Sequence, residues 1–357
     1  MTNNEADPQQ SSTKKPAFGG KQWVATILTI LVIVLVFAVV FPSLGNYSQA
    51  WAAVQQMSAG WIIALVLFTI GVVVIYPWPF QTALPGLKYR PAFVIRQTSF
   101  MIGNVIPEGG AIGLGVQYEM LGSYGFGSGP SAAAIGITSV SNTLVTLALP
   151  VLGLVGLVSI GEATSTDYVA AIVGVVVIGI AVAAIMFVLR SASSARRVGD
   201  WADDIVEWFM GLFHKKADPH LGNSLVKFRS SVIGSVSGRG KLVTGANLVQ
   251  QLSQFAVLFI AILALQGGFG GNVNLAEAFA AFAIARLAQF IPIPPGGLGT
   301  TDAILIGLLT NFGMSSSEAM AADLIWRAAT YLPQVLIGIG TLLVWRKRQR
   351  KTAQHAT

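Results

Sequence analysis

The chain has 357 residues, of which 54% are hydrophobic and only 10% are charged, and its formal net charge is +7. Soluble domains carry roughly 25% charged residues, so this composition excludes an ordinary soluble fold and favours an integral membrane protein. The lack of cysteine excludes disulfides and thiolate metal sites, and the three histidines lie in polar segments. We therefore expect an all-α integral membrane protein without a metal or another cofactor.

Six uncharged segments are long enough to cross a hydrocarbon core of ~30 Å as full transmembrane helices. They cover residues 23–41, 61–80, 131–161, 169–189, 242–265 and a last segment that ends at Trp345. The polytopic membrane domain is thus expected over residues 23–345. We expect a disordered cytoplasmic N-terminus over residues 1–22 and a basic cytoplasmic tail over residues 346–357.

The basic residues indicate the orientation, because Lys and Arg gather in cytoplasmic loops. Twenty of the 22 lie in four segments, residues 14–21, 88–96, 190–241 and 346–351, whereas the opposite loops near 42–60, 162–168 and 266–274 have none. We therefore expect a multi-pass protein of the cytoplasmic membrane with both termini in the cytoplasm. The positive charge is attributed to this orientation and not to a nucleic-acid partner.

Residues 196–241 form a sizeable polar region within the membrane domain. Its apolar residues recur at helical spacing opposite acids: Trp201, Ile205, Trp208, Phe209, Leu212 and Phe213 opposite Asp203, Asp204 and Glu207. This pattern predicts an amphipathic cytoplasmic helix, which lies at the headgroups or packs on the ends of the spans. The region is too short for a catalytic domain, so we do not expect an enzyme.

Two apolar segments are interrupted: residues 92–122, with GNVIPEGGAIGLG, and residues 275–312, with QFIPIPPGGLGTTD. Neither half of either segment reaches the roughly 20 residues that a crossing needs. We expect each to form a re-entrant helical hairpin that enters and leaves on one side of the membrane. A full crossing kinked at proline is the alternative.

The two breaks are related by a constant offset. Each pair of equivalent positions is 187 residues apart: Pro107 and Pro294, Gly109 and Gly296, Gly110 and Gly297. The order span, hairpin, span also recurs over residues 61–160 and 248–345, and counting crossings places the hairpins on opposite sides. Such inverted repeats with broken helices are typical of transporters, and the free N–H groups at a break suit an anionic ligand. Alternatively, the glycines serve only close helix packing.

Ionisable residues inside the apolar segments are candidate functional residues, because a charge in hydrocarbon costs several kcal/mol unless it is paired or hydrated. They are Glu108, Glu119, Glu277, Arg286, Asp302, Asp323 and Arg327. Asp323 and Arg327 are four residues apart on one helix, so we expect them to pair. Arg286 has no acid at helical spacing.

The run IPIPPGGLGTTDAILIGLL, followed by AADLIWRAATYLPQVLIGIG, resembles the lysylphosphatidylglycerol synthase transmembrane-region family, which includes the flippase-like half of bacterial multiple-peptide-resistance-factor proteins. The matching residues are Pro292, Pro294, Pro295, Gly296, Gly297, Gly299, Arg327 and, where glutamate is commoner, Asp302. In the first half, Asn104 and Pro107 resemble an N-x-x-P loop, but the arginine expected in the following helix is missing. The resemblance implies a stand-alone, flippase-like protein without the soluble synthase domain.

Together these features predict a lipid flippase that moves an anionic or zwitterionic lipid, a phospholipid or a polyprenyl-linked glycolipid, across a bacterial cytoplasmic membrane. The expected headgroup-binding residues are Arg286, Arg327, Asp302, Asp323, Gly296, Gly297, Gly299, Pro294, Asn104, Pro107, Gly109, Gly110 and Glu119. The alternative is a non-transporting scaffold or accessory subunit that anchors an envelope-biosynthesis enzyme through residues 196–241 and the basic tail.

Overall fold

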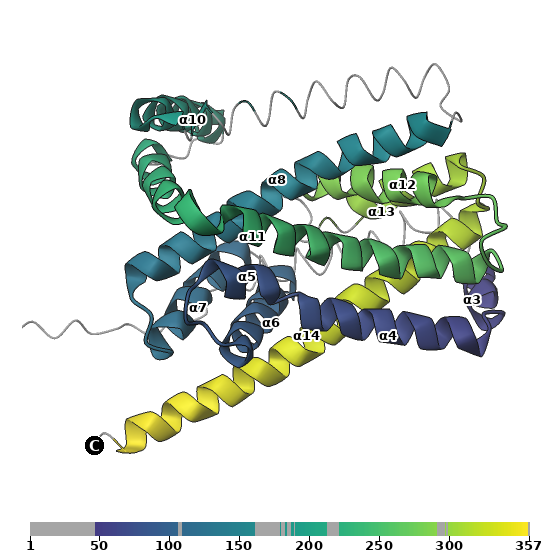
Figure 1. The fold of residues 1–357 in the computed structure, drawn as a ribbon, viewed down its shortest axis with the longest axis horizontal. Coiled ribbons are helices and arrows are strands. Elements are labelled where there is room, and N and C mark those ends of the chain that lie inside the picture. The colour runs from purple at the N-terminus through teal and green to yellow at the C-terminus, as the bar shows by residue number, and fades with distance from the viewer. Residues whose placement is uncertain are drawn as a thin grey trace, which may run out of the picture.

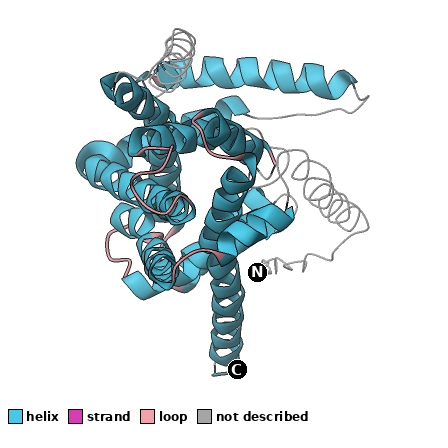
Figure 2. Ribbon diagram, turned by 90° about the vertical axis from the view of Figure 1, so that its right-hand side faces the viewer, coloured by secondary structure: helices cyan, strands magenta, loops and turns pink. Residues whose placement is uncertain are grey.

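The computed structural model describes residues 47–105, 109–160, 190–212, 221–290, 297 and 299–355, with a few isolated positions between 179 and 188. Throughout this part of the chain the secondary structure is helical, without a strand (Figure 2). The elements are α3 (Tyr47–Gln55), α4 (Ala59–Ile75), α5 (Trp78–Ala83), α6 (Tyr89–Val105), α7 (Gly109–Ser123), α8 (Ser128–Ile160), α10 (Ala192–Leu212), α11 (Leu221–Leu265), α12 (Leu275–Leu287), the 3-10 turn η2 (Ala288–Phe290), α13 (Thr300–Asn311) and α14 (Ser316–His355) (Figure 1).

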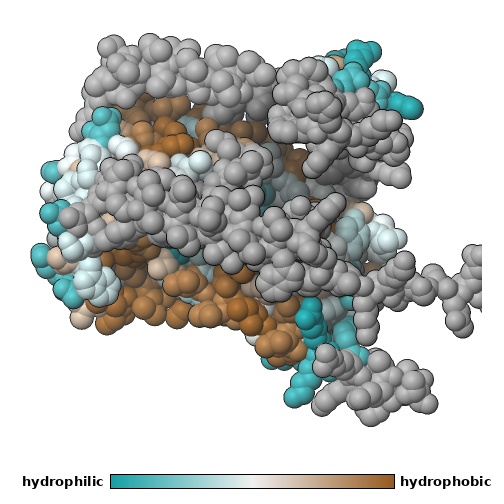
Figure 3. Space-filling model, turned by 180° about the vertical axis from the view of Figure 1, so that it is seen from behind, coloured by the Kyte–Doolittle hydropathy of each residue, from teal (hydrophilic) through white to brown (hydrophobic). Residues whose placement is uncertain are grey.

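Four stretches are long and apolar enough to cross a membrane. They are Ala59–Ala83, Ser128–Val158, Arg239–Leu265 and Ser316–Gln349. Their outer faces are apolar, as the broad brown surface in Figure 3 shows, and Ile63 and Leu67 of α4 are each 61% exposed. Four predicted spans are thereby confirmed as helices of spanning length. The predicted span 23–41 and most of 169–189 lie outside the described residues.

Each interrupted segment folds into two short helices that pack against each other: α6 with α7, and α12 with α13. In the first pair the helices are antiparallel, because Gly109 lies against Ile102 while Gly113, one turn later, lies against Ser99. The second pair begins at Asn274, whose side-chain oxygen accepts hydrogen bonds from the backbone N–H groups of α12. Neither segment is therefore a single kinked helix.

The two helix pairs pack reciprocally on the long helices. Helix α6 packs on α14, and α12 packs on α8 (Figure 1). Both contacts are close at a glycine: a Cβ at Gly338 would lie 2.5 Å from the carbonyl oxygen of Gln97, and a Cβ at Gly153 would lie 2.9 Å from the Cα of Ala280. The long helices also each contain a proline in their interior, α8 at position 150 and α14 at position 333.

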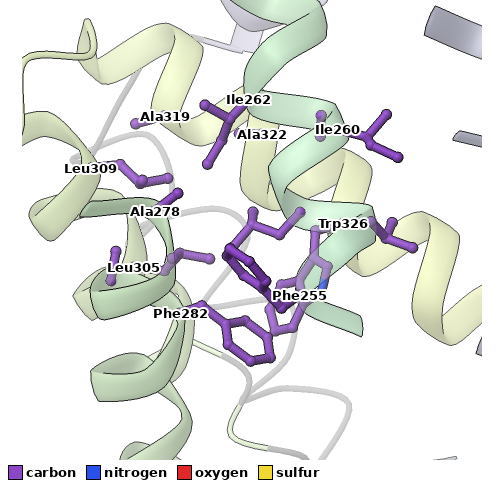
Figure 4. Close-up of a cluster of buried hydrophobic side chains, with 14 of the residues drawn as sticks. Phe255, Ile260, Ile262, Ala278, Phe282, Leu305, Leu309, Ala319, Ala322 and Trp326 are labelled. Carbon is purple, nitrogen blue, oxygen red and sulfur yellow. The ribbon is translucent and has the colours of Figure 1, made fainter. Parts of the chain in front are cut away.

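Two hydrophobic cores hold these elements together. The larger one joins α11, α12, α13 and α14, and its centre is a group of edge-to-face and tilted rings (Figure 4). Phe282 lies 5.9 Å from the ring of Trp326 and 5.5 Å from that of Phe255. The Trp326 indole N–H also donates to the carbonyl oxygen of Gln254 at 3.1 Å. These contacts fix the rotation of α14 and so determine where its next residue, Arg327, points.

The polar region 196–241 contains the predicted amphipathic helix and the beginning of a longer one. Its first part lies in α10, which packs on α11, and its second part belongs to α11, which continues without interruption into the span (Figure 1). The predicted span 242–265 agrees with the apolar part of α11, and the polar residues before it belong to the same helix, which the glycines at 238 and 240 do not interrupt. Trp201 on α10 is exposed.

Candidate functional site

A polar pocket of about 270 Å³ lies between the two halves of the described membrane domain. Residues from α6, α8, α11, α12, η2, α14 and the end of α4 line it. They are Tyr76, Arg96, Phe100, Asn104, Asn142, Gln250, Gln254, Arg286, Gln289, Thr330, Tyr331 and Gln334. Such a concentration of amide, hydroxyl and guanidinium groups inside an apolar protein is the usual mark of a ligand path.

Arg286 enters the pocket from the last turn of α12 and is only 6% exposed. One terminal nitrogen donates to the Oε1 of Gln254 at 2.8 Å, and the guanidinium lies 5.5 Å from the ring centre of Phe282. Its Nε has no hydrogen-bond partner among the described residues, and none of their carboxylates forms a salt bridge with it. A buried cation with only a neutral amide partner is costly, so this position favours an anion.

Arg96 is a second guanidinium in the pocket. It lies on α6 over the ring of Tyr76, 4.7 Å from the ring centre, and 5.8 Å from that of Phe80. Its Nε is buried and has no partner in the part of the chain that the structure describes. The charge pattern had placed Arg96 with Lys88 and Arg90 in a cytoplasmic segment, whereas it lies within α6 and lines the pocket. Its place inside the interrupted segment 92–122 was the available signal.

Arg327 is held beside the pocket by an ion pair at the second break. Its Nε donates to Oδ1 of Asp302 at 2.5 Å, and its Nη2 lies 3.4 Å from the carbonyl oxygen of Gly297. The other carboxylate oxygen of Asp302 accepts the backbone N–H of Gly299 at 2.6 Å, which caps α13. The spacing had predicted Asp323 as the partner. The structure pairs Arg327 with Asp302 instead, because α13, which begins just before Asp302, packs on α14.

The glycines at the two breaks differ in backbone conformation and in the space available for a side chain. Gly297 and Gly299 have φ values of +66° and +87°, which other residues rarely adopt. Gly109 contacts the backbone of Ile102, where a Cβ would overlap the carbonyl oxygen, whereas a Cβ at Gly110 would meet no described atom within 4 Å. Gly109 therefore serves close packing of α6 on α7, which was the alternative explanation of these glycines.

Of the remaining predicted site residues, some line the central pocket and others lie elsewhere. Asn104 lines the pocket and donates its side-chain N–H to the carbonyl oxygen of Phe100 at 2.8 Å. Glu119 lies instead in a separate pocket of about 350 Å³ that Trp345 and Arg346 also line. Glu277, another acid noted in the apolar part, closes the capping box with Asn274 at the start of α12. Glu108, Pro107, Pro292, Pro294, Pro295 and Gly296 lie outside the described residues.

Sequence reasoning also missed the neutral polar wall of the pocket. Gln250 and Gln254 lie one turn apart on α11, and Tyr331 and Gln334 lie about one turn apart on α14. The signal was present in the run NLVQQLSQF, because four amide side chains within one predicted span are unusual where lipid is the only neighbour.

Residues 24–338 match the family model described as the lysylphosphatidylglycerol synthase TM region. The chain belongs to this family. It is similar to two UPF0104 membrane proteins of Methanothermobacter thermautotrophicus: it is 25% identical to one over 283 residues, which are 78% of this chain and 81% of that protein, and 33% identical to the other over 67 residues, 19% of each. The resemblance seen in the sequence is thus confirmed, and the protein is a multi-pass membrane protein.

Proposed function

We propose that this member of the lysylphosphatidylglycerol synthase TM region family is a lipid transporter, and not an enzyme, whose central pocket takes an anionic headgroup. The observation that carries the proposal is the pair Arg96 and Arg286, two guanidinium groups in one polar pocket without a salt bridge to any carboxylate of the described residues. A phosphate offers the oxygen acceptors that a guanidinium fork fits.

The size of the pocket favours a headgroup over a whole lipid. Its volume of about 270 Å³ lies below the roughly 300–1,000 Å³ of pockets that enclose drug-sized ligands. An apolar groove of about 1160 Å³ runs between α3, α4 and α14. The two spaces are separated by α14. Its residues Ala329 and Pro333 line the groove, and the next residues, Thr330 and Gln334, line the pocket. This arrangement supports a lipid whose headgroup enters the pocket while its tails stay in the groove.

The packing supports an inverted repeat with re-entrant hairpins. The pair α6 and α7 and the pair α12 and α13 each pack on the final long helix of the other half, with a close glycine contact in both places. Each of the two long helices also has a proline in its interior, at position 150 in α8 and at position 333 in α14. In such proteins the halves rock about a shared site. We assign the basic tail and residues 196–241 to the cytoplasmic face.

Reconstituted vesicles test this proposal. Purified protein should accelerate the transbilayer movement of fluorescent phosphatidylglycerol, measured by quenching of the outer leaflet with dithionite. Arg286→Gln and Arg96→Gln should each remove this acceleration, because each removes a headgroup charge. Arg90→Gln is the matched control, since Arg90 is an exposed residue of the same helix as Arg96.

Two results would contradict the proposal. Wild-type protein that moves lipid no faster than empty vesicles would favour the scaffold alternative. Full transport by both pocket variants, with the same folded yield as Arg90→Gln, would make the two arginines structural charges.

A further inference from the structure

The break of the second helix pair holds an ion pair and one additional acid. Asp302 and Asp323 are both 0% exposed, and Arg327 is 8% exposed. Both oxygens of Asp302 are occupied, Oδ1 by the Arg327 guanidinium and Oδ2 by the backbone N–H of Gly299. One guanidinium therefore compensates the charge of one carboxylate.

Asp323 is the unexplained group. It lies one turn before Arg327 on α14, and neither of its oxygens accepts a hydrogen bond from any residue that the structure describes. This carboxyl is thus fully buried without a described donor that could stabilise a negative charge on it. A protonated carboxyl carries no net charge, so these surroundings favour the protonated form of Asp323.

The charge balance gives the same result. With Asp302 ionised, an ionised Asp323 would be a buried negative charge without a hydrogen-bond donor among the described residues, which is strongly unfavourable. Asp302 of α13 and Arg327 of α14 are the charged groups of the described residues that act on Asp323. Helices α3, α4, α6 and α11 also pack on α14, but none of their described residues brings a charge near Asp323. The charge of Arg286 on α12 and the hydroxyl of Tyr331 on α14 instead interact with Arg327.

We propose that Asp323 holds one exchangeable proton beside the ion pair of Arg327 and Asp302, and that this proton is transported with the anionic lipid. The second part rests on the proposed function. The proton lies on an Asp323 oxygen. It leaves to water when the rocking halves expose this site to one face of the membrane, and a proton from water restores it when the site faces the other side.

The position of the proton site determines whether the proton and the anionic headgroup move in the same direction or in opposite directions. The proton site lies close to the headgroup pocket. Thr330 and Tyr331 follow Arg327 by three and four residues on α14, and both line the pocket. Arg286, in the pocket, also interacts electrostatically with Arg327. Loss of the proton would change the group of two acids and one arginine from neutral to negative. The pocket would then bind an anion less tightly, and by reciprocity an anion in the pocket favours the protonated state. Proton and anionic headgroup should therefore move in the same direction.

Infrared spectroscopy of the full chain in lipid bilayers at pH 7 tests the proton site without any transport. A protonated carboxyl gives a C=O stretching band that shifts on transfer to D2O. The band should be present in the wild type and absent in Asp323→Asn. It should also be absent in Asp302→Asn, because the remaining acid then pairs with Arg327 and ionises. Glu318→Gln, on the same helix but only partly buried, should keep the band.

The spectra can overturn the proton site directly. A wild type without the band, or an unchanged band in both aspartate variants, contradicts it. The two aspartate variants are independent, so failure of one to fold leaves the other as the test.

Vesicles of phosphatidylcholine and phosphatidylglycerol with an imposed pH gradient test the coupling. Lipid movement by the wild type should be faster in the direction in which protons flow, and Asp323→Asn should show equal rates in both directions. Wild-type transport that ignores the gradient would overturn the coupling and leave the proposed function standing. No lipid movement together with the infrared band would overturn the proposed function, and with it the coupling, but would support the proton site.

Discussion

The close contact between α6 and α14 should make Gly338 intolerant of a methyl group. A Cβ there would lie 2.5 Å from the carbonyl oxygen of Gln97 and 2.5 Å from the Cβ of Met101. Backbone atoms cannot move aside as a flexible side chain can, so Gly338→Ala should cost about 1–3 kcal/mol, the range for overpacking. Gly340 is the matched control two residues away, because a Cβ there meets no described atom within 4 Å.

Both substitutions gain the helix propensity of alanine over glycine, about 1 kcal/mol, so the difference between them isolates the contact. Unfolding in mixed micelles, followed by circular dichroism, should show Gly338→Ala less stable than Gly340→Ala by about 1–3 kcal/mol. The equivalent contact of α8 and α12 predicts the same direction for Gly153→Ala, where the Cβ would lie 2.9 Å from the Cα of Ala280. Equal stability of Gly338→Ala and Gly340→Ala would refute the reciprocal packing of the two halves.

Other substitutions test the two breaks. Gly109→Ala should lower the thermal midpoint in detergent, because its methyl group overlaps the carbonyl of Ile102, while Gly110→Ala should leave it nearly unchanged; equal midpoints would argue against the observed α6–α7 contact. Arg327→Gln should destabilise by about 3–5 kcal/mol, the cost of breaking a buried ion pair. Asp302→Asn should destabilise less, because a second acid on α14 is available to pair with Arg327; chemical unfolding that ranks the two variants in the opposite order would contradict this.

The elements that could be predicted from the sequence are those that a local property determines. An uncharged run of about 20 residues is sufficient for a span, so α4, α8, α11 and the end of α14 were expected near their observed positions. Proline and glycine at the breaks in turn predicted two pairs of short helices. In the segment 196–241 the repeating apolar residues predicted a helix, which is α10, whereas the length of α11 was not evident, because the change from polar to apolar residues at position 241 does not end the helix.

The composition of the site depended on contacts between distant segments, which spacing along one helix does not indicate. Asp323 is at the right spacing to pair with Arg327, yet Asp302, 25 residues away in the sequence, forms the ion pair because the left-handed turn at Gly299 directs the start of α13 toward α14. Arg96 was assigned to a loop because charge counting ignores how far into a helix a residue lies. Arg286, in contrast, was found, since a lone charge in an apolar segment is informative by itself.

Headgroup binding by Arg96 and Arg286 is tested most directly by mass spectrometry of the lipid that co-purifies with the protein from membranes. Wild-type protein should retain an anionic lipid at about one molecule per site, and the double variant Arg96→Gln, Arg286→Gln should lose it while Arg90→Gln keeps it. Retention of the same anionic lipid in the same amount by the double variant, or a wild type that carries only neutral lipids, would contradict binding of an anionic headgroup in the central pocket.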